Sequence, residues 1–536
     1  MHFLIASAVR NDSVLCKERE REALLSIKRD LIDHYGRLSS WGSEEDKRDC
    51  CKWDYITCSP RTGHVTQLDF TGVGLRGKMS HSLLDLRHLT DLGLFDNDFG
   101  GTQFPIDKNG SLAKLRYLHL SCANFGGTIS SVLRNLSSLQ FLALSYNHFV
   151  DIGNSDWVSG LSSLTYLDLT RIPLVNPNHW LQIVNNYKLL HLQTLRLQYC
   201  FSGDEINTLP LSPINSSSAL TDISLFDNNF VIPSIYPWLS NISQNIQFLD
   251  LSSNILYGSA LADFDKIISL PYINLSNTTI GGYIPKSFGN MSQLQYLYLS
   301  SNKFNMKLFD LIQNLSGFTE RSLEELSLDH NQIGGELPFS LRNCTKLNFL
   351  ELSGNKLSGN VPIWFGKSLS SLQYLSLRSN QFSGSLPLQL CQLTNVQILD
   401  LSINNINGTI PHCLNNLRAM IDENSNETIL HDYGPLLQHS LLRFHDDDEA
   451  LVLWKGSEYI LDKNLGRFRI IDLSSNKIEG EIPREIAILS SLRQLNLSNN
   501  KLSGAIPEEI DGLKQLESLD LSQNQLSGRL PASMSI

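Results

Sequence analysis

One pattern of apolar and polar positions recurs along most of this chain, and the segment from Leu347 to Pro362 shows it most clearly. Its frame is L-x-x-L-x-L-x-x-N-x-L-x-G-x-x-P, and most copies follow one another after 24 to 29 residues. Seventeen copies in register predict a repeat architecture rather than an ordinary single-core domain. The Asn position of the frame, here called the Asn column, is filled by Asn97, Asn147, Asn228, Asn254, Asn302, Asn331, Asn355, Asn380, Asn404, Asn476, Asn500 and Asn524, and in degenerate copies by Val73, Ala123, Ile172, Cys200 and Thr278.

Each position of the frame has a physical role. The L-x-L alternation predicts a short strand with buried leucines and outward-facing x residues. An Asn in the column can bond the backbone of neighbouring turns, so we interpret Cys200 there as a buried structural thiol rather than a reactive one. Gly and Pro then turn the chain onto the back of the coil. One repeat cannot bury its own leucines, so we predict an α/β repeat fold, a right-handed leucine-rich-repeat solenoid with capped ends.

Residues 16–64 are predicted to form the N-terminal cap. Glu18 to Tyr35 carries Ala23, Leu24, Ile27, Leu31 and His34 at helical spacing, which predicts a helix laid over the first repeat, with Trp41 and Trp53 beside it. Residues 1–15 contain a thin apolar run that we interpret as a possible signal-peptide remnant.

Four of the nine cysteines lie in this cap and suit two disulfides, for which three connectivities are possible. We expect Cys16–Cys50 and Cys51–Cys58. A zinc site is the less favoured alternative, because Cys50 and Cys51 are adjacent rather than two to four residues apart. Cys391 and Cys413 occupy nearly equivalent positions on consecutive turns, which is close enough for a third bridge.

The cap segment Cys50-Cys51-Lys52-Trp53-Asp54-Tyr55-Ile56-Thr57-Cys58, the Leu-Ser-Gly-x-Ile-Pro repeat ending and Arg61-Thr62-Gly63-His64-Val65 resemble those of plant extracellular leucine-rich-repeat receptors. The similarity is greatest to receptor-like proteins of the ethylene-inducing xylanase receptor type. Tyr55 departs from the family pattern, which usually has Gly there. The resemblance supports the Cys391–Cys413 bridge and implies an extracellular binding protein that contacts its ligand through loops and an inserted island.

The frame is interrupted once. Repeats 1–14 are predicted over residues 65–420, an island over 421–467 and repeats 15–17 over 468–536. The island holds ten acidic and four basic residues. Its run Asp446, Asp447, Asp448 and Glu449 is a candidate contact for a basic patch on a partner. We favour a solvated acidic loop over a metal site, because the run has no calcium-loop spacing.

Aromatic residues mark a candidate ligand-binding face. The position six residues before the Asn column is aromatic in eight repeats, and we call these eight residues the aromatic lane. Two interpretations of the lane, anchors for a partner or ordinary cross-strand packing, remain equally open. Phe95 and Phe226 replace the usual Ser two positions before the column, which favours contact sites. The candidate ligand-binding aromatics are Phe95, Tyr117, Phe141, Tyr166, Phe226 and Tyr296, and the other lane members are Phe248, Tyr272, Phe349 and Tyr374.

The charge and the motifs of the chain limit the range of possible functions. The net charge of -11 argues against nucleic acid as a partner, and no apolar stretch is long enough to span a membrane. Gly72 to Gly77 fits a dinucleotide-binding fingerprint, but the repeat frame already explains it, so we expect no enzyme, cofactor or metal. Disulfides and sequons indicate an extracellular or cell-surface location. The expected glycosylation sites are Asn109, Asn135, Asn215, Asn241, Asn290, Asn314, Asn343, Asn407 and Asn426.

We therefore expect an extracellular receptor-like protein of plant immunity that recognises a secreted microbial protein or peptide. The alternatives are a soluble inhibitor or decoy of a cell-wall-degrading enzyme and a developmental peptide receptor. The resemblance also implies a co-receptor or adaptor receptor kinase as partner. The sequence stops at Ile536, inside the repeat that begins at Leu516, before the cap, membrane helix and tail of such receptors. We accordingly expect a C-terminally truncated product or a partial gene model.

Overall fold

The computed structural model of this protein describes residues 15–107, 109–150, 155–174, 180, 189–201, 219–228, 245–256, 261, 270–422, 450–454, 457–461 and 468–532. Residues 1–14, the acidic run Asp446–Glu449 and three expected glycosylation sites, Asn215, Asn241 and Asn426, lie outside the described residues. The chain divides into two compact units, Met1–Phe230 and Val231–Ile536.

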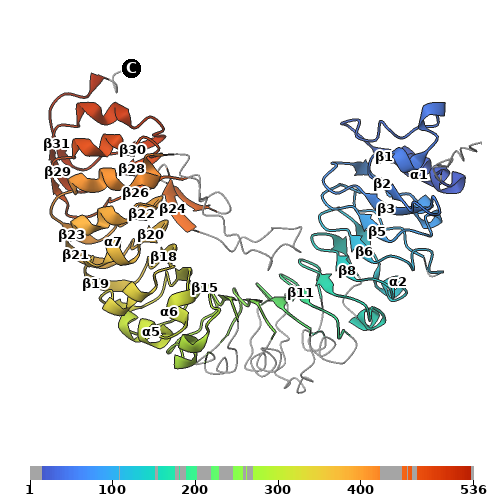
Figure 1. Cartoon of the computed structure of the whole chain (residues 1–536), viewed down its shortest axis with the longest axis horizontal. Helices are drawn as coiled ribbons and strands as arrows, with labels where there is room; N and C mark the ends of the chain where they lie inside the picture. Colours follow the sequence, from blue (N-terminus) through green and yellow to red (C-terminus); the bar gives the residue numbers. More distant parts are fainter. Residues whose placement is uncertain are drawn as a thin grey trace, which may run out of the picture. The chain divides into compact units, whose positions relative to one another are not determined.

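The first unit is organised by a parallel sheet to which each repeat contributes one short strand (Figure 1). Neighbouring strands pair in register, so that Leu118 lies opposite Leu142 and Leu142 opposite Leu167. The frame therefore sets the register, because a slip of one residue would move the buried leucines to the solvent side. The strands are β3 (Val65–Asp69), β5 (Asp91–Gly93), β6 (Tyr117–His119), β8 (Phe141–Ala143), β10 (Tyr166–Asp168), β11 (Thr194–Arg196) and β12 (Asp222–Ser224).

The second unit repeats this arrangement. Strands β22 and β26 pair directly, Leu399 opposite Ile471, although the island separates them in sequence. The island is therefore an insertion between two adjacent turns, and an antiparallel hairpin of β24 (Ala450–Trp454) and β25 (Ser457–Leu461) lies within it. The parallel strands are β13 (Phe248–Asp250), β14 (Tyr272–Asn274), β15 (Tyr296–Tyr298), β16 (Glu325–Ser327), β18 (Phe349–Glu351), β20 (Tyr374–Ser376), β22 (Ile398–Asp400), β26 (Ile470–Asp472), β28 (Gln494–Asn496) and β30 (Ser518–Asp520).

The segments after the Asn column form further short strands, which the frame alone does not predict. They are β4 (Arg76–Gly77), β7 (Gly126–Gly127), β9 (His148–Phe149), β17 (Gly334–Gly335), β19 (Lys356–Asn360), β21 (Gln381–Ser385), β23 (Asn405–Asn407), β27 (Glu479–Gly480), β29 (Lys501–Gly504) and β31 (Gln525–Leu526). These strands pair in parallel with their neighbours, except β4, which pairs antiparallel with β1 (Leu31–Ile32) in the cap.

Short helical segments form the back of the repeats, on the side away from the main strands (Figure 1). Many begin directly after the frame's Pro, which is the N-cap residue and has extended backbone geometry. The α-helices are α2 (Ser130–Leu133), α5 (Leu308–Leu315), α6 (Thr319–Ser322) and α7 (Phe365–Ser368). The 3-10 turns are η3 (His81–Asp85), η4 (Ser155–Gly160), η6 (Lys286–Asn290), η7 (Phe339–Asn343), η8 (Leu388–Gln392), η9 (His412–Asn416), η10 (Arg418–Met420), η13 (Arg484–Ile488) and η14 (Glu508–Gly512).

The Asn column forms the expected ladder between turns. The Asn355 amide donates to the carbonyls of Leu328, Leu352 and Ser353 at 2.9, 3.2 and 3.0 Å, and its oxygen accepts from the Ile333 N–H at 3.0 Å. One side chain therefore satisfies four buried backbone groups that would otherwise be costly to leave unpaired.

Degenerate copies keep the ladder by other means. Where Ala123 replaces Asn, its backbone carbonyl accepts the bond from the Phe99 N–H that an Asn oxygen accepts elsewhere, at 2.9 Å. Cys200 is buried, and its thiol contacts the carbonyl oxygens of Leu169 and Gln198 at 3.2 Å each. Burial also raises the pKa of the Cys200 thiol well above its usual value. The predicted burial of Cys200 is confirmed.

The residue directly before the Asn column adopts left-handed backbone geometry in every repeat. Gly72 and Gly354 occupy this position in two repeats, but Tyr146, Arg171 and Ile403 also take it, with φ values of 55°, 61° and 53°. This position follows the end of the main strand by three residues, as Tyr146 follows β8 and Arg171 follows β10. The frame did not predict this conformation, which is uncommon for residues other than Gly and Asn.

The cap helix is shorter than predicted. Helix α1 spans Glu18–Asp30 and buries Ala23, Leu24 and Ile27. Leu31 instead begins the two-residue strand β1 (Leu31–Ile32), which pairs with β4, so His34 lies exposed in a turn and the predicted extension to Tyr35 is wrong. The reason is tertiary, because a Cβ on Gly77 would lie 2.6 Å from the Asp30 carbonyl, and only glycine allows this close pairing.

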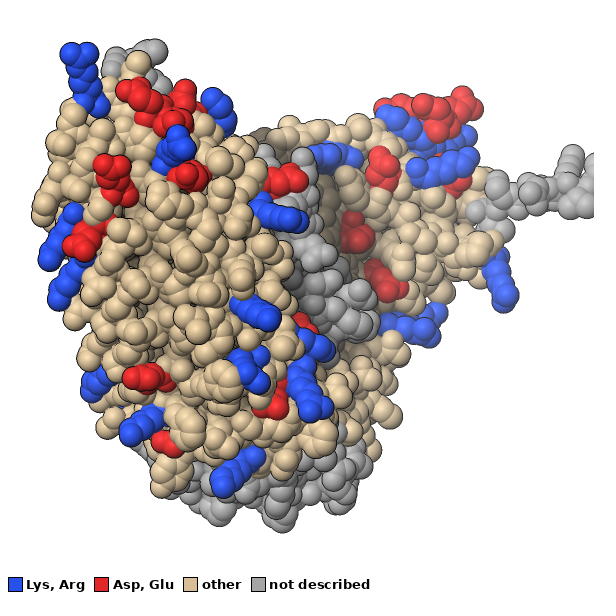
Figure 2. Space-filling view, turned by 60° about the vertical axis from the view of Figure 1, so that its left-hand side comes forward, with Lys and Arg blue, Asp and Glu red and all other residues tan. Residues whose placement is uncertain are grey.

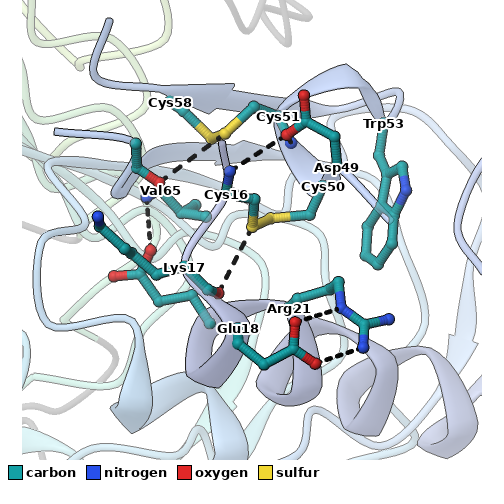
Figure 3. Close-up of a disulfide and its surroundings, with 12 residues drawn as sticks. Cys16, Lys17, Glu18, Arg21, Asp49, Cys50, Cys51, Trp53, Cys58 and Val65 are labelled. Atoms are coloured by element: carbon teal, nitrogen blue, oxygen red, sulfur yellow. Dashed lines mark hydrogen bonds and ion pairs between the residues drawn. A yellow bond between two sulfur atoms is a disulfide. The ribbon is translucent and has the colours of Figure 1, made fainter. Parts of the chain in front are cut away.

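The remainder of the cap agrees with expectation. Trp41 and Trp53 are buried and stack with ring centroids 5.2 Å apart. The structure contains the disulfides Cys16–Cys50 and Cys51–Cys58, which lie close together at the N-terminal end of α1 (Figure 3). Cys50 and Cys51 lie in η2 (Cys50–Lys52), Cys58 ends β2 (Ile56–Cys58), and Cys16 precedes α1; η1 (Glu45–Lys47) comes before η2.

Tyr55 has a φ of 68°, which explains the family's preference for Gly at this turn. The third expected bridge, Cys391–Cys413, joins η8 to η9 with the two Cα atoms 5.7 Å apart. Cys122, Cys200 and Cys344 remain as free thiols.

Candidate ligand-binding surface

Three of the predicted aromatic residues form one stack on the strand face of the first unit. The rings of Tyr117 and Phe141 lie 4.4 Å apart, and those of Phe141 and Tyr166 lie 4.2 Å apart, in both cases nearly parallel. These spacings follow the separation of adjacent strands. Tyr117 and Phe141 are half-buried, whereas Tyr166 is buried. All three rings therefore pack across neighbouring strands, and those of Tyr117 and Phe141 also remain partly accessible from the strand face.

A buried histidine extends this stack toward Phe95. The His119 ring packs face to face with Phe95 at 5.0 Å and edge to face with Phe141, and its Nδ1 lies 3.2 Å from the Tyr117 hydroxyl. Its Nε2 is buried without a hydrogen-bond partner. Burial lowers the pKa of His119 to about 4, so the ring is neutral at physiological pH.

The edge of the same face carries an arginine between two tyrosines. Tyr146, Arg171 and Tyr199 all occupy the left-handed position before the Asn column on consecutive turns. The Arg171 guanidinium carbon lies 5.2 Å from the Tyr146 ring centre and 4.6 Å from that of Tyr199, and Tyr199 contacts Phe226 at 4.9 Å. Arg171 is exposed, and the other three side chains are half-buried.

We call these residues of the first unit the aromatic array: Phe95, Tyr117, His119, Phe141, Tyr146, Tyr166, Arg171, Tyr199 and Phe226. The sequence pattern predicts five of these residues. It misses His119 and the three residues at the left-handed position, Tyr146, Arg171 and Tyr199. The sequence contained a signal for these three residues, because many other repeats have a small or polar residue directly before the Asn column.

The sixth predicted contact residue lies in the second unit. Tyr296 is buried, as are its neighbours Phe248, Tyr272 and Tyr298, which form one cluster. Phe248 and Tyr272 stack at 4.3 Å, as do Phe349 and Tyr374 further along the sheet. Here the lane serves cross-strand packing, which was the second of the two interpretations.

The strand face of the second unit carries buried acids. Asp400 and Asp472 occupy paired positions on β22 and β26, and each accepts a bond from a serine N–H at 2.9 Å. Burial and the charge of Asp472 raise the pKa of Asp400 to about 7, although Arg378, 4.0 Å away, acts in the opposite direction. Acidic and basic side chains are interspersed over a mostly uncharged surface on the face shown in Figure 2.

The expected glycosylation sites show where glycans can attach. Asn109, Asn135, Asn290, Asn343 and Asn407 are exposed. Asn290 and Asn343 end the 3-10 turns η6 and η7 on the back of their repeats, and Asn135 follows α2 there. Asn314 differs from these sites. It lies in helix α5, and its amide nitrogen, to which a glycan would attach, donates a hydrogen bond to the Ile284 carbonyl at 2.7 Å.

The stacked parallel strands, the Asn ladder and the disulfide-bonded cap together define the class: this chain belongs to the leucine-rich-repeat proteins. Family models described as leucine rich repeat match residues 113–173, 244–304, 322–344, 346–368, 371–393, 395–417 and 467–526. The leucine rich repeat N-terminal domain matches residues 17–59.

Within this class the chain is similar to plant receptor-like proteins. It is 33% identical over 363 residues to Receptor-like protein EIX1 of Solanum lycopersicum, covering 65% of this chain and 34% of that protein. Receptor-like protein EIX2 of the same plant gives 33% over 361 residues with the same coverage. The chain thus spans about a third of the length of these relatives. The relatives are receptor-like proteins rather than enzymes, in agreement with the lack of a catalytic motif.

Solved structures share the fold. The plant peptide hormone receptor RGFR1 in complex with RGF2 has a TM-score of 0.57 at 23% identity, covering 90% of this chain and 66% of that one. The Arabidopsis receptor kinase HAESA, in complex with the peptide hormone IDA and the co-receptor SERK1, has a TM-score of 0.53 at 24% identity, with 97% and 92% covered. No helix among the described residues is long and apolar enough to cross a membrane.

Proposed function

We propose that this chain is the ligand-binding part of an extracellular plant receptor-like protein that recognises a secreted microbial protein or peptide in immunity. The homology to EIX1 and EIX2 supports the receptor-like assignment. The peptide complexes of RGFR1 and HAESA support a peptide or protein ligand, and the co-receptor in the HAESA complex supports a co-receptor as a second partner.

The aromatic array is the observation that carries this proposal. Tyr, Arg and other aromatic side chains are enriched among residues that dominate binding energy, because they offer large contact areas at low entropic cost. Phe141 and Tyr117 are held by stacking, and Arg171 is held between two rings. These side chains therefore lose little conformational entropy when a ligand binds.

The glycosylation pattern agrees with this choice of face. Asn135 follows α2 on the back of its repeat, away from the strands that present the array. Glycans there leave the strand face of the first unit open to a macromolecule. The island hairpin β24–β25 is a second candidate contact region, as the resemblance to receptor-like proteins implies.

The test is capture of secreted microbial proteins on the purified chain, followed by affinity measurement with each purified candidate. We expect Arg171→Gln and Phe226→Ser to weaken binding at least tenfold. Phe339→Ser is the matched control, because Phe339 is an exposed aromatic residue on the back of the second unit. Equal affinities for the array variants and the wild type would refute the strand face as the binding surface. A variant lacking residues 421–467 tests the island in the same assay.

A further inference from the structure

Three potential metal ligands from three separate elements meet where the cap joins the repeats. Glu20 comes from helix α1, His64 directly precedes β3, and His88 lies in the turn before β5. The Glu20 Oε1 atom lies 2.9 Å from Nδ1 of His64 and 3.7 Å from Nδ1 of His88. The three ligand atoms all lie within 4.8 Å of one another.

The carboxylate is fixed in place and oriented. The Glu20 side chain is 5% exposed, and its Oε2 accepts the Val65 N–H at 2.8 Å. That bond leaves Oε1 facing the two imidazoles. Hydrogen bonds that orient ligand side chains in this way are a general feature of metal sites, because they fix the geometry before the ion arrives.

We propose that Glu20, His64 and His88 bind a divalent transition-metal ion of the zinc type. Two imidazole nitrogens and one carboxylate oxygen are a ligand set that zinc accepts, with a fourth position left for water. With metal–ligand distances of about 2.0–2.1 Å, the ligand atoms of a tetrahedral site lie roughly 3.3 Å apart. The distances from Glu20 Oε1 to the two nitrogens, 2.9 and 3.7 Å, lie on either side of that value.

The imidazoles must turn to bind the ion. The His64 and His88 rings stack with centroids 3.7 Å apart and planes 14° apart, so their in-plane lone pairs run side by side rather than converging. Both side chains are partly exposed, at 29% and 39%, so rotation about the side-chain bonds meets solvent rather than core.

The bound ion links α1 to the first two repeats and so reinforces the junction that the two cap disulfides already stabilise.

The test uses the full, untagged chain with zinc alone, measured by calorimetry, and with Co²⁺ as a spectroscopic probe. We expect one Zn²⁺ per chain with a dissociation constant in the micromolar range, visible d–d bands with Co²⁺, and a higher melting temperature in the presence of Zn²⁺. His64→Gln and His88→Gln should each weaken binding at least tenfold. His81→Gln is the matched control, because His81 is an exposed histidine on the neighbouring turn η3.

Two outcomes would overturn the proposal. One is the absence of stoichiometric binding of either ion to the wild-type chain. The other is unchanged binding in both His64→Gln and His88→Gln, which would assign the ion to a different site. Glu20→Gln keeps an oxygen for the Val65 N–H, so it separates loss of metal binding from loss of the cap structure.

Discussion

The phenol of Tyr374 donates a hydrogen bond to the Glu351 carboxyl group on the preceding strand, and both side chains are buried. Burial is the main reason that the pKa of Glu351 rises from 4.5 to about 8, and the charge of Asp329 adds to it. The strand face of the second unit therefore holds a carboxyl group that stays protonated at neutral pH.

This raised pKa predicts lower stability at alkaline pH. Between pH 4.5 and 8 the folded chain holds a proton on Glu351 that the unfolded chain releases, so the free energy of unfolding falls as pH rises through this window. Glu351→Gln cannot titrate, so it should match the wild type near pH 5 and exceed it by roughly 1–3 kcal/mol near pH 8. Denaturant unfolding at both pH values measures the difference. If the free energy of unfolding had the same pH dependence in the two proteins, the prediction would be contradicted. The titration of Asp400 and Asp472 occurs in both proteins and therefore cancels in the comparison.

The Asn ladder predicts a graded loss of stability along the column. Asn355→Ala removes four hydrogen bonds and leaves the buried Leu328 carbonyl and Ile333 N–H without a partner, at a cost of about 3 kcal/mol. Asn524 makes the same type of bonds but is half-buried, so water can replace part of the loss in Asn524→Ala and we expect about 1 kcal/mol. Chemical denaturation of both variants tests the order. Equal losses of stability in the two variants would show that burial of the Asn side chain does not determine how much its hydrogen bonds contribute to the free energy of unfolding.

Ile403 occupies the left-handed position with a β-branched side chain that is 42% exposed. Because Asn tolerates this conformation far better, Ile403→Asn should raise the free energy of unfolding by about 1 kcal/mol. The reverse change at the same position of another repeat, Asn499→Ile, should lower it by at least as much, since Asn499 also bonds Ser475. A thermal melt of the two variants gives opposite shifts if backbone strain is the cause. Shifts of the same sign would contradict that account.

The Cys391–Cys413 bridge closes a short loop across two consecutive turns. Its sequence separation of 22 residues predicts a contribution of roughly 3 kcal/mol through the unfolded state. The double variant Cys391→Ala, Cys413→Ser should therefore melt several degrees below the wild type under oxidising conditions. Cys344→Ala, which removes a buried free thiol instead, is the control for small core changes. No difference in melting temperature between the double variant and the wild type would show that the bridge contributes nothing to stability.

The sequence by itself determined the repeat register, the buried leucines and the position of the cap. These follow from local periodicity, because Leu350 and Leu375 must face inward wherever the frame recurs and must then pair across neighbouring strands. The departure of Tyr55 from the family's Gly also marked a turn that the structure shows to be left-handed.

Only the tertiary structure decided which outward-facing side chains meet. Arg171 lies between Tyr146 and Tyr199 because stacked turns bring residues more than twenty positions apart into contact, and all three occupy the left-handed position before the Asn column. Glu20 reaches His64 and His88 for the same reason, since no sequence spacing relates a cap helix to the turns it covers. The early end of α1 at Asp30 likewise depends on a distant residue, Gly77, whose missing side chain admits the pairing that replaces the last helical turn.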